Sequence, residues 1–281
     1  MSDLSDKVRR SIKVLRMYRG EDPIEVSYSG GKDSDVILAL TKMAGIPYRA
    51  IYKNTTIDPP YTVKHCKDNG VEVLMPKERF LDIIARKGFP TRRARFCCEV
   101  LKEYKVLDNS VQGIRRSEST KRATNYSEKE PIICRNYKKG EHVNVFLLIL
   151  DWSNKDVADF INAHDIKCHP LYYIEQGKFC VERRLGCIGC PMQSDNGVAD
   201  FKQYPKMLRQ WIRAEEKWFV RPRLAASGVG VRGKFSNAYE VMAHDLFFDD
   251  YDSFQAANTS MFGKEDWKQR LEDYFQIDLT L

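Results

Sequence analysis

The sequence has no apolar run of the about 18 residues that a membrane-spanning helix needs, and no apolar targeting segment at its start. These absences predict a cytoplasmic protein without a membrane partner. Histidine is scarce, with five residues among 281, and none is spaced as in H-E-x-x-H or a similar ligand pattern. A hydrolase built on a histidine-bound metal ion therefore has no support.

The composition is that of a soluble globular protein, with 43% apolar and 30% charged residues. In such a protein we expect the eight cysteines to be free thiols, metal ligands or redox groups rather than a disulfide framework. Lysine and arginine exceed aspartate and glutamate by 46 to 39. A net charge of +7 suits a polyphosphate, a sulfate ester or nucleic acid without choosing among them.

A strand-like run over residues 24–28 leads into a glycine pair and then into a helix-like pattern over 33–44. The glycines let the backbone come close to a ligand, and the start of a helix offers unpaired amides and the positive end of its dipole. A lysine and hydroxyl groups add donors, so the segment predicts a phosphate-binding loop. Its spacing is neither G-x-x-x-x-G-K-[ST] nor G-x-G-x-x-G. The candidate ligand-binding residues are Ser27, Ser29, Gly30, Gly31, Lys32, Asp33 and Ser34.

Strand-like and helix-like runs alternate through the first part of the chain, after a first helix expected over 5–18. This alternation predicts an α/β fold, a doubly wound and mostly parallel sheet with helices on both faces. Ligands bind such sheets beyond the carboxyl ends of the strands, which adds Asn54 and Thr55 as a wall for adenine or ribose. We expect strands at 24–28, 48–52, 71–74, 110–114 and 143–149, and helices at 33–44, 60–69, 78–87 and 97–107.

After residue 190 the sequence no longer alternates between strand-like and helix-like runs. An amphipathic helix is expected over 204–219, a glycine-bearing loop over 226–236, and short helices over 237–281. We therefore predict three parts: a nucleotide-binding α/β domain at 1–175, a cysteine knuckle at 176–195, and a helical C-terminal cap at 196–281.

Two further segments carry candidate chemistry. Residues 113–122 join a glycine to arginines and hydroxyls, a combination suited to a second anionic group because guanidinium forks pair with phosphate or sulfate oxygens. The candidates there are Gly113, Arg115, Arg116, Ser119 and Arg122.

Cys187 and Cys190 form a C-x-x-C knuckle that supplies two thiolates. Zinc and an iron–sulfur cluster both accept four thiolate ligands, so the knuckle alone does not distinguish them.

Several of these segments resemble known proteins. Residues 29–34 resemble the pyrophosphate loop of the ATP pyrophosphatase superfamily, whose members split ATP between the α and β phosphates. Residues 113–122 resemble the G-x-R-x-x-x-S-x-x-R segment of sulfonucleotide reductases, and residues 148–157 resemble their P-L-x-x-W-x-x-x-D-V segment, with Leu148-Ile149 in place of Pro-Leu. As a set over residues 25–192, the motifs resemble the phosphoadenosine phosphosulfate (PAPS) reductase family, which implies an adenine nucleotide α-hydrolase-like fold.

The resemblance also implies a metal cofactor. The adjacent Cys97-Cys98 pair is similar to the tandem cysteines that, with a distant C-x-x-C, hold a [4Fe-4S] cluster in adenylyl-sulfate reductases. In the DNA phosphorothioation branch a cysteine that precedes R-x-G-C-x-x-C joins the cluster, which makes Cys180 a rival ligand. Four of the five would bind the cluster, with Zn²⁺ as the alternative: Cys97, Cys98, Cys180, Cys187 and Cys190.

Within the family the resemblance favours ATP cleavage. Reductases attack the sulfonate with a cysteine in a Glu-Cys-Gly tail, whereas the last cysteine here is Cys190. The loop keeps Lys32 and Asp33, as ATP-cleaving relatives such as the sulfate adenylyltransferase small subunit do. We therefore expect ATP and Mg²⁺ to bind, with Lys32, Asp33 and Arg116 as catalytic groups in adenylation and sulfur transfer, in sulfur metabolism or nucleic-acid thiolation.

Two other functions stay open. A PAPS or adenylyl-sulfate (APS) reductase that releases sulfite with an unusual thiol such as Cys180 is one, and a non-enzymatic nucleotide-binding module is the other. Further candidate partners are a sulfur donor protein, a second copy of the chain and nucleic acid. The basic residues that could follow a nucleic-acid backbone are Lys202, Lys206, Arg209, Arg213, Arg221 and Arg223.

Overall fold

The computed structural model describes residues 3–18, 20–128, 130–136, 140–219, 234–260 and 263–280. The chain divides into two compact units, each discontinuous in sequence. The first comprises Met1–Asn54, Asp58–Pro76 and Leu101–Gly186, and the second comprises Thr55–Ile57, Lys77–Val100 and Cys187–Leu281. The domain boundaries expected after residues 175 and 195 stay predictions. Most of the loop expected over 226–236, with Arg221 and Arg223, lies outside the described residues.

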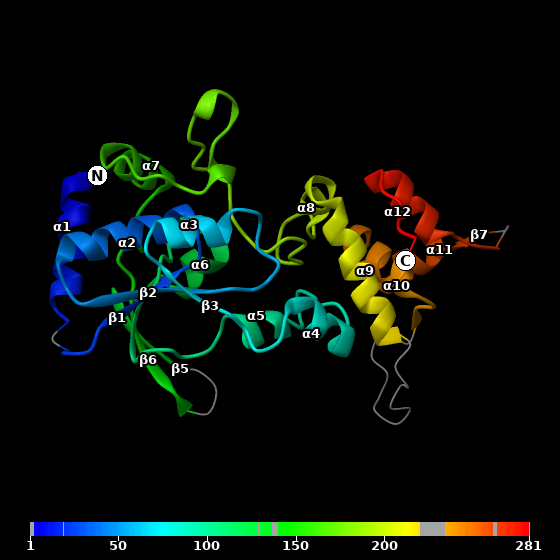
Figure 1. The fold of residues 1–281 in the computed structure, drawn as a ribbon, viewed down its shortest axis with the longest axis horizontal. Helices are drawn as coiled ribbons and strands as arrows, with labels where there is room; N and C mark the ends of the chain where they lie inside the picture. Colours follow the sequence, from blue (N-terminus) through cyan, green and yellow to red (C-terminus); the bar gives the residue numbers. More distant parts are fainter. Residues whose placement is uncertain are drawn as a thin grey trace. The chain divides into compact units, whose positions relative to one another are not determined.

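The first unit is built on a six-stranded sheet (Figure 1). Its strands are β1 (Ile24–Tyr28), β2 (Tyr48–Lys53), β3 (Glu72–Leu74), β4 (Asn109–Val111), β5 (Ile132–Asn136) and β6 (His142–Phe146). Their order is β3-β2-β1-β4-β6-β5, and every pair is parallel except β5 with β6. The strand order reverses at β1, between β2 and β4. Open sheets bind ligands at such a switch point, and the Ser29–Ser34 loop follows β1 there.

Helices flank this sheet. Its helices are α1 (Leu4–Arg16), α2 (Lys32–Ala44), α3 (Thr62–Asp68), α6 (Thr120–Asn125) and α7 (Asn154–Ala163). Helices α1, α2 and α7 pack on one another, and their apolar side chains share one buried cluster with strand residues such as Val26 and Phe146. Val145, next to Phe146, belongs to a second cluster with Ile114 and Ile133. Successive strand side chains point to opposite faces, so the two clusters cover the two faces of the sheet.

The second unit consists mainly of helices. These are α4 (Phe80–Lys87), most of α5 (Phe96–Leu101), α8 (Val198–Gln203), α9 (Pro205–Phe219), α10 (Ala238–Phe247), α11 (Tyr251–Asn258) and α12 (Trp267–Phe275), with a hairpin of β7 (Thr259–Ser260) and β8 (Gly263–Lys264). Helix α4 packs on α9, where the Trp211 ring lies 4.8 Å from that of Phe80 and 5.6 Å from that of Phe89. Among all described residues, no helix is long and apolar enough to cross a membrane.

The predicted α/β fold, with its mostly parallel sheet and C-terminal helices, is confirmed, but two local predictions are wrong and one strand was not expected. The strand expected to reach Ile149 ends at Phe146, because the next residues form a buried turn in which Leu148 O accepts the hydroxyl proton of Ser11 at 2.6 Å. The helix expected over 97–107 ends at Leu101. Strand β5 was not predicted, because an antiparallel edge strand of five residues leaves little periodic signal.

Candidate nucleotide site

The glycine loop between β1 and α2 passes close to neighbouring side chains. Gly30 has a φ of +78°, a left-handed conformation that favours glycine, and a Cβ there would lie 3.0 Å from Thr62 Cγ2. A Cβ on Gly31 would lie 3.2 Å from the hydroxyl oxygen of Tyr172. The two loop positions therefore require glycine, Gly30 for its conformation and for space and Gly31 for space, while the close approach to a ligand stays a prediction.

The two loop serines brace the turn itself. Ser34 Oγ donates to Gly31 O at 2.6 Å, and the backbone amides of Ser34 and Asp35 donate to the same carbonyl at 2.9 and 3.0 Å. Ser29 Oγ accepts the Gly31 amide at 3.4 Å. These bonds fold the chain into the first turn of α2, so that Lys32 lies at the amino end of the helix.

Lys32 is a buried cation at the amino end of α2, with 5% of the residue exposed. Its Nζ lies 3.4 Å from Asp33 Oδ2 and donates to Arg183 O at 3.4 Å. Burial lowers the pKa of Lys32, while the neighbouring Asp33 carboxylate opposes this change. A buried ammonium with two long contacts remains able to bind a stronger anion such as a phosphate.

Asp33 is held by Arg115, the largest fully buried side chain among the described residues. Arg115 Nε donates to Asp33 Oδ1 at 2.7 Å, and Nη1 donates to Ser117 Oγ at 2.9 Å and to Trp152 O at 3.4 Å. With 1% of its surface exposed, Arg115 acts here as a support for Asp33. Its expected direct grip on a second anion stays a prediction.

Gly113 brings the end of β4 against the start of α2. A Cβ on this glycine would lie 3.1 Å from the carbonyl oxygen of Asp33 and 3.3 Å from its Cβ. A side chain at this position would therefore push the two segments apart. The structure thus joins two predicted site residues, Gly113 and Asp33, that lie 80 positions apart in sequence.

A second group of cations surrounds Glu118. Arg122 forms an ion pair with Glu118 Oε2, which also accepts the Arg115 backbone amide at 3.3 Å, and Arg184 Nη2 lies 3.7 Å from Glu118 Oε1. Burial lowers the pKa of Arg122, and the positive charge of Arg184 lowers it further. Ser119 caps α6 by accepting the Arg122 amide at 3.2 Å. Arg122 and Arg184 therefore place two positive charges close to each other, and Arg122 also interacts electrostatically with Asp33 of the loop.

Arg116, predicted to be catalytic, is engaged elsewhere. Its Nε donates to Tyr126 O at 2.7 Å, and its Nη1 forms an ion pair with Asp151. Both partners belong to the segments around α6 and α7. A catalytic role for Arg116 stays a prediction.

A cavity of about 190 Å³ lies beside the loop in the first unit. Ser29 and Ser27 line it, and Ser27 Oγ donates to Glu25 Oε1 at 2.8 Å. Lys53, also on its wall, lies 3.6 Å from the buried Glu25 carboxylate. Asn54 follows directly after β2, where its amide donates to Leu74 O at 3.0 Å. The cavity gives the loop an adjoining polar compartment.

Four of the five candidate metal ligands belong to the second unit: Cys97, Cys98, Cys187 and Cys190. Cys97 lies beside Cys98, whose hydrogen bond is the main cause that raises the pKa of Cys97, with burial and the charge of Cys187 adding to it. The Cys187 thiol donates to Thr55 Oγ1 at 3.6 Å. Thr55, expected at the nucleotide, is thus a neighbour of the cysteines.

The C-x-x-C knuckle is a tight turn. Gly189 has a φ of +72°, and a Cβ there would lie 2.2 Å from the ring of Phe201. The amide of Cys190 donates to Cys187 O at 3.3 Å, and that of Gly189 donates to Asp200 Oδ2 at 2.9 Å. Glycine is therefore required at position 189 for conformation and for space.

The donor set fits a thiolate-bound metal in its chemistry, because the neighbouring thiols of Cys98 and Cys187 raise the pKa of Cys97, and a bound cation would relieve the repulsion among their thiolates. No group of three described His, Cys, Asp or Glu side chains is already arranged to hold a metal ion. Cys180 belongs to the first unit, where its amide donates to Tyr172 O at 2.7 Å. The choice of four ligands stays a prediction.

Comparison with known proteins decides the family. Residues 23–193, more than half of the chain, match the phosphoadenosine phosphosulfate reductase domain. The chain belongs to this family. An uncharacterized protein of Methanocaldococcus jannaschii is 27% identical over 225 residues, 73% of this chain and 51% of that protein. Sulfate adenylyltransferase subunit 2 of Shewanella pealeana is 25% identical over 218 residues, 63% of this chain and 69% of that protein.

The chain spans about half the length of the curated relatives that it matches first. Among solved structures, U34-tRNA thiolase NcsA from Methanococcus maripaludis with its [4Fe-4S] cluster has a TM-score of 0.42 and 16% identity, covering 83% of this chain and 86% of that one. At that score the likeness supports no inference about this chain. Family membership confirms the predicted resemblance, and the family's members include enzymes that act on adenine nucleotides.

Two residues near the loop were given no role from the sequence. Tyr172 covers the loop: its ring lies 5.4 Å from Lys32 Nζ and its hydroxyl hydrogen-bonds with the backbone of Lys32. Arg184 joins the cations around Glu118. The sequence carries one signal for each, because Tyr172 ends the 169–172 turn and Arg184 opens the R-x-G-C-x-x-C segment of the cysteine knuckle.

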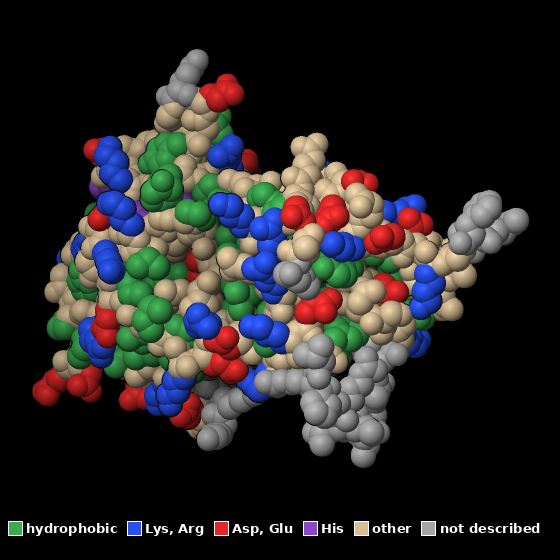
Figure 2. Space-filling model, turned by 45° about the vertical axis from the view of Figure 1, so that its right-hand side comes forward, with side chains coloured by type: hydrophobic (Ala, Val, Ile, Leu, Met, Phe, Trp, Pro, Cys, Tyr) green, Lys and Arg blue, Asp and Glu red, His purple; other side chains and the backbone are tan. Residues whose placement is uncertain are grey.

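Four of the basic residues proposed for nucleic acid lie on α8 and α9, namely Lys202, Lys206, Arg209 and Arg213. Among them, Arg209 Nε donates to Asp278 O at 2.8 Å, and Lys202 lies 4.4 Å from the centre of the Tyr274 ring. Figure 2 shows lysine and arginine side chains mixed with acidic ones over the visible face. Nucleic acid as a partner stays a prediction.

Proposed function

We propose that this chain binds ATP on the Ser29–Ser34 loop and cleaves it between the α and β phosphates, which releases pyrophosphate and transfers the adenylyl group to an acceptor oxygen. A sulfur nucleophile then attacks the acceptor and displaces AMP. The observation that carries the proposal is the buried Lys32 at the amino end of α2, with Asp33 fixed beside it by Arg115. An anionic ligand such as a phosphate suits a buried ammonium at a helix amino end, with a buried arginine close by.

The loop accounts for the leaving group. The dipole of α2 and the Lys32 ammonium stabilise the negative charge that develops on pyrophosphate as the α–β bond breaks. Arg122 and Arg184 extend the positive surface for the terminal phosphates. The adjoining cavity, with Ser27 and Ser29 on its wall, offers polar groups to the nucleoside.

Asp33 is the residue that would hold Mg²⁺. Its Oδ1 is bound to Arg115, and Oδ2 lies 3.4 Å from Lys32 Nζ, so a carboxylate oxygen is directed to the place where the phosphates would lie. Magnesium would supply charge neutralisation on the phosphate oxygens. Arg115 fixes the direction of the Asp33 carboxylate.

Calorimetric titration with ATP and Mg²⁺ tests the proposal. We expect Lys32→Ala to weaken ATP binding about 10- to 100-fold, because it removes a charge-assisted contact of about 1.5–3 kcal/mol. Lys42→Ala, at the exposed end of the same helix, is the matched control and keeps the affinity of the wild type. Equal affinities in wild type and Lys32→Ala would contradict the proposal.

We further propose that Cys97, Cys98, Cys187 and Cys190 hold a [4Fe-4S] cluster, which would present or activate sulfur when bound. Their common unit, the hydrogen bond of Cys97 with Cys98 and the electrostatic interaction of Cys97 with Cys187 support this choice over Cys180. Anaerobic purification should give about four iron and four sulfide per chain, and Cys187→Ser should lose them. Cys134→Ser, at an exposed position, is the control. Zinc without sulfide would overturn the cluster.

The second candidate is a PAPS or APS reductase, favoured by the family to which the chain belongs. The same loop would then bind a sulfonucleotide, and a thiol such as Cys180 would attack its sulfur. Release of sulfite from PAPS in the presence of thioredoxin, lost in Cys180→Ser, would support this reading. The intact Lys32 and its buried surroundings favour ATP.

A further inference from the structure

Tyr28 and Asp35 flank the six-residue loop Ser29–Ser34 on its two sides. Tyr28 is the last residue of β1, and Asp35 lies in the first turn of α2. The Tyr28 hydroxyl donates to Asp35 Oδ1, and both residues are 3% exposed. Because this bond joins the residues before and after the loop, it fixes the distance between the loop's two ends.

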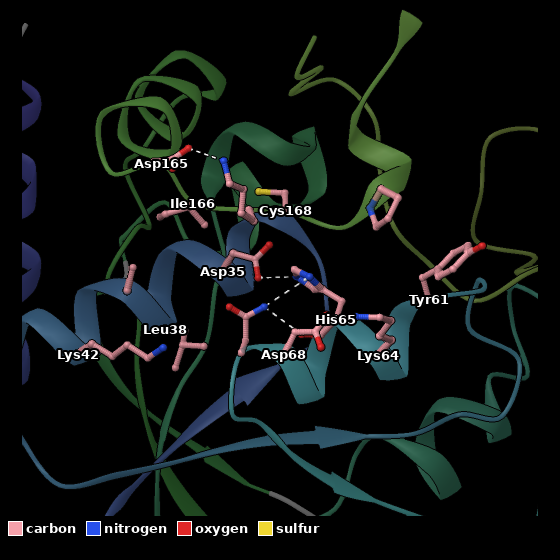
Figure 3. Close-up of a pocket in the computed structure, with 14 residues that line it drawn as sticks. Asp35, Leu38, Lys42, Tyr61, Lys64, His65, Asp68, Asp165, Ile166 and Cys168 are labelled. Carbon is pink, nitrogen blue, oxygen red and sulfur yellow. Dashed lines mark hydrogen bonds and ion pairs between the residues drawn. The ribbon is translucent and has the colours of Figure 1, made fainter. Parts of the chain in front are cut away.

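A third residue completes this contact from another helix. His65 Nε2, on α3, lies 2.9 Å from the Tyr28 hydroxyl oxygen. The same atom lies 2.9 Å from Asp35 Oδ1 (Figure 3). On its other side, Nδ1 lies 3.4 Å from the Asn69 amide nitrogen, which can only donate. Nε2 therefore carries the proton and donates it to the Asp35 carboxylate.

Tyr28 stays protonated in this arrangement, and the hydrogen bonds from His65 and Tyr28 oppose the rise that burial causes in the pKa of Asp35. Burial raises the pKa of Tyr28, and the negative charge of Asp35 raises it further. The hydroxyl therefore stays a donor at all physiological pH values. With Tyr28 and His65 both donating, Asp35 receives two hydrogen bonds on one oxygen.

The short hydrogen bonds to Gly31 O lie in the first turn of α2, and the side chains at the two ends of the loop make only a long contact with each other. Ser29 Oγ and Ser34 Oγ are 3.4 Å apart, a long contact, and Gly30 and Gly31 add conformational freedom. We propose that Tyr28, Asp35 and His65 form a loop clamp, which holds Ser29–Ser34 in its anion-binding conformation and makes His65 a positioning residue. This inference rests on the proposed function, because the loop matters as a nucleotide site.

The clamp can be reached from solvent. A groove of about 650 Å³ between α2, α3 and residues 165–170 has Asp35 and His65 on its wall. Figure 3 shows the side chain of His65 directed from α3 towards Asp35, with Cys168 beyond it. If the imidazole of His65 is removed, a small molecule of the same shape can enter from this groove and take its place.

The test combines His65→Ala with added imidazole. We expect the variant to bind ATP about 10-fold more weakly, and its amides at 30–34 to exchange hydrogen faster, because a hydrogen bond to a buried charge is lost. Millimolar imidazole should restore both properties, and His65→Gln, which keeps an N–H donor, should retain part of them. Lys64→Ala, the exposed neighbour on α3, is the matched control and behaves as wild type.

Wild-type ATP affinity together with wild-type exchange in His65→Ala would overturn the clamp. So would a loss that imidazole does not reverse and that comes with faster exchange along the whole of α2 and α3, because it marks a general packing defect. If His65→Ala does not fold, Tyr28→Phe removes only the hydroxyl: faster exchange confined to the loop supports the clamp, and unchanged exchange overturns it. If wild type binds no ATP, the proposed function fails, while the exchange rates still decide the clamp.

Discussion

Arg115 and Asp33 form a buried ion pair directly beside the candidate nucleotide loop. The pair is 2.7 Å long, and the arginine side chain is 1% exposed. Removing one partner of such a pair leaves the other charged and without compensation, which costs far more than losing a surface pair. At the scale of single residues, this pair decides where the Asp33 carboxylate can point.

We expect Arg115→Met to lower the free energy of unfolding by about 3 kcal/mol, measured by urea denaturation. Arg49→Met is the matched control, because its pair with Glu72 has both side chains more than 40% exposed and is worth about 0–1 kcal/mol. Equal losses in the two variants would show that the Arg115–Asp33 pair is not a buried support.

His169 supplies a pH-dependent contribution to stability. It is fully buried, and its Nε2 lies 3.0 Å from Pro60 O. Burial lowers the pKa of His169, so the unfolded chain takes up a proton that the folded chain resists. Stability is therefore complete above about pH 6.5 and falls as the pH drops towards the lower pKa of the folded state. We expect His169→Gln to flatten this fall between about pH 7 and 5; an unchanged slope in urea titrations would contradict it.

At the scale of elements, the strand, loop and helix around residues 24–44 could be predicted from the sequence. Their glycines, hydroxyls and helix pattern are local signals, and the structure places β1 and α2 within two residues of the expected bounds. The loop clamp could not be predicted, because His65 lies 30 positions beyond Asp35 on a separate helix. Nothing in the pattern of α3 distinguishes a buried functional histidine from a core residue.

The knuckle around Gly189 gives a test at this scale. We expect Gly189→Ala to lower the iron and sulfide content of anaerobically purified protein strongly, because φ is +72° and the new Cβ would meet the Phe201 ring. Gly186→Ala, where a Cβ meets nothing within 4 Å, should load as wild type does. Equal loading of both variants would mean that this turn does not shape the site.

At the scale of the whole molecule, the sequence did not reveal which segments group together. The helix pattern over 78–87 looks like any other helix of an α/β domain, yet α4 packs on α9 in the second unit. Long-range aromatic contacts of Trp211 with Phe80 and Phe89 hold α4 against α9. Such contacts join residues more than 100 positions apart, and no local periodicity records them.

Trp211→Ala tests this grouping in the full chain. The buried indole, 4% exposed, leaves a cavity that costs about 3–5 kcal/mol, so we expect faster hydrogen exchange in α4 and α9 with unchanged exchange in β1 and β2. Trp218→Ala, near the end of the same helix and only partly buried, is the control and has a smaller effect. Exchange that rises equally in β1 and α4 would contradict two separate units.

The central claim is that this chain binds ATP on the Ser29–Ser34 loop, which contains Lys32, and cleaves it between its α and β phosphates. Phosphorus NMR of ATP and Mg²⁺ with anaerobically purified protein tests it most directly. Water takes the place of the acceptor in this assay, because no other acceptor is added. We predict the slow appearance of AMP and pyrophosphate, absent in Lys32→Ala and present in Lys42→Ala. Formation of ADP and phosphate, or unchanged ATP together with sulfite release from PAPS, would contradict the claim.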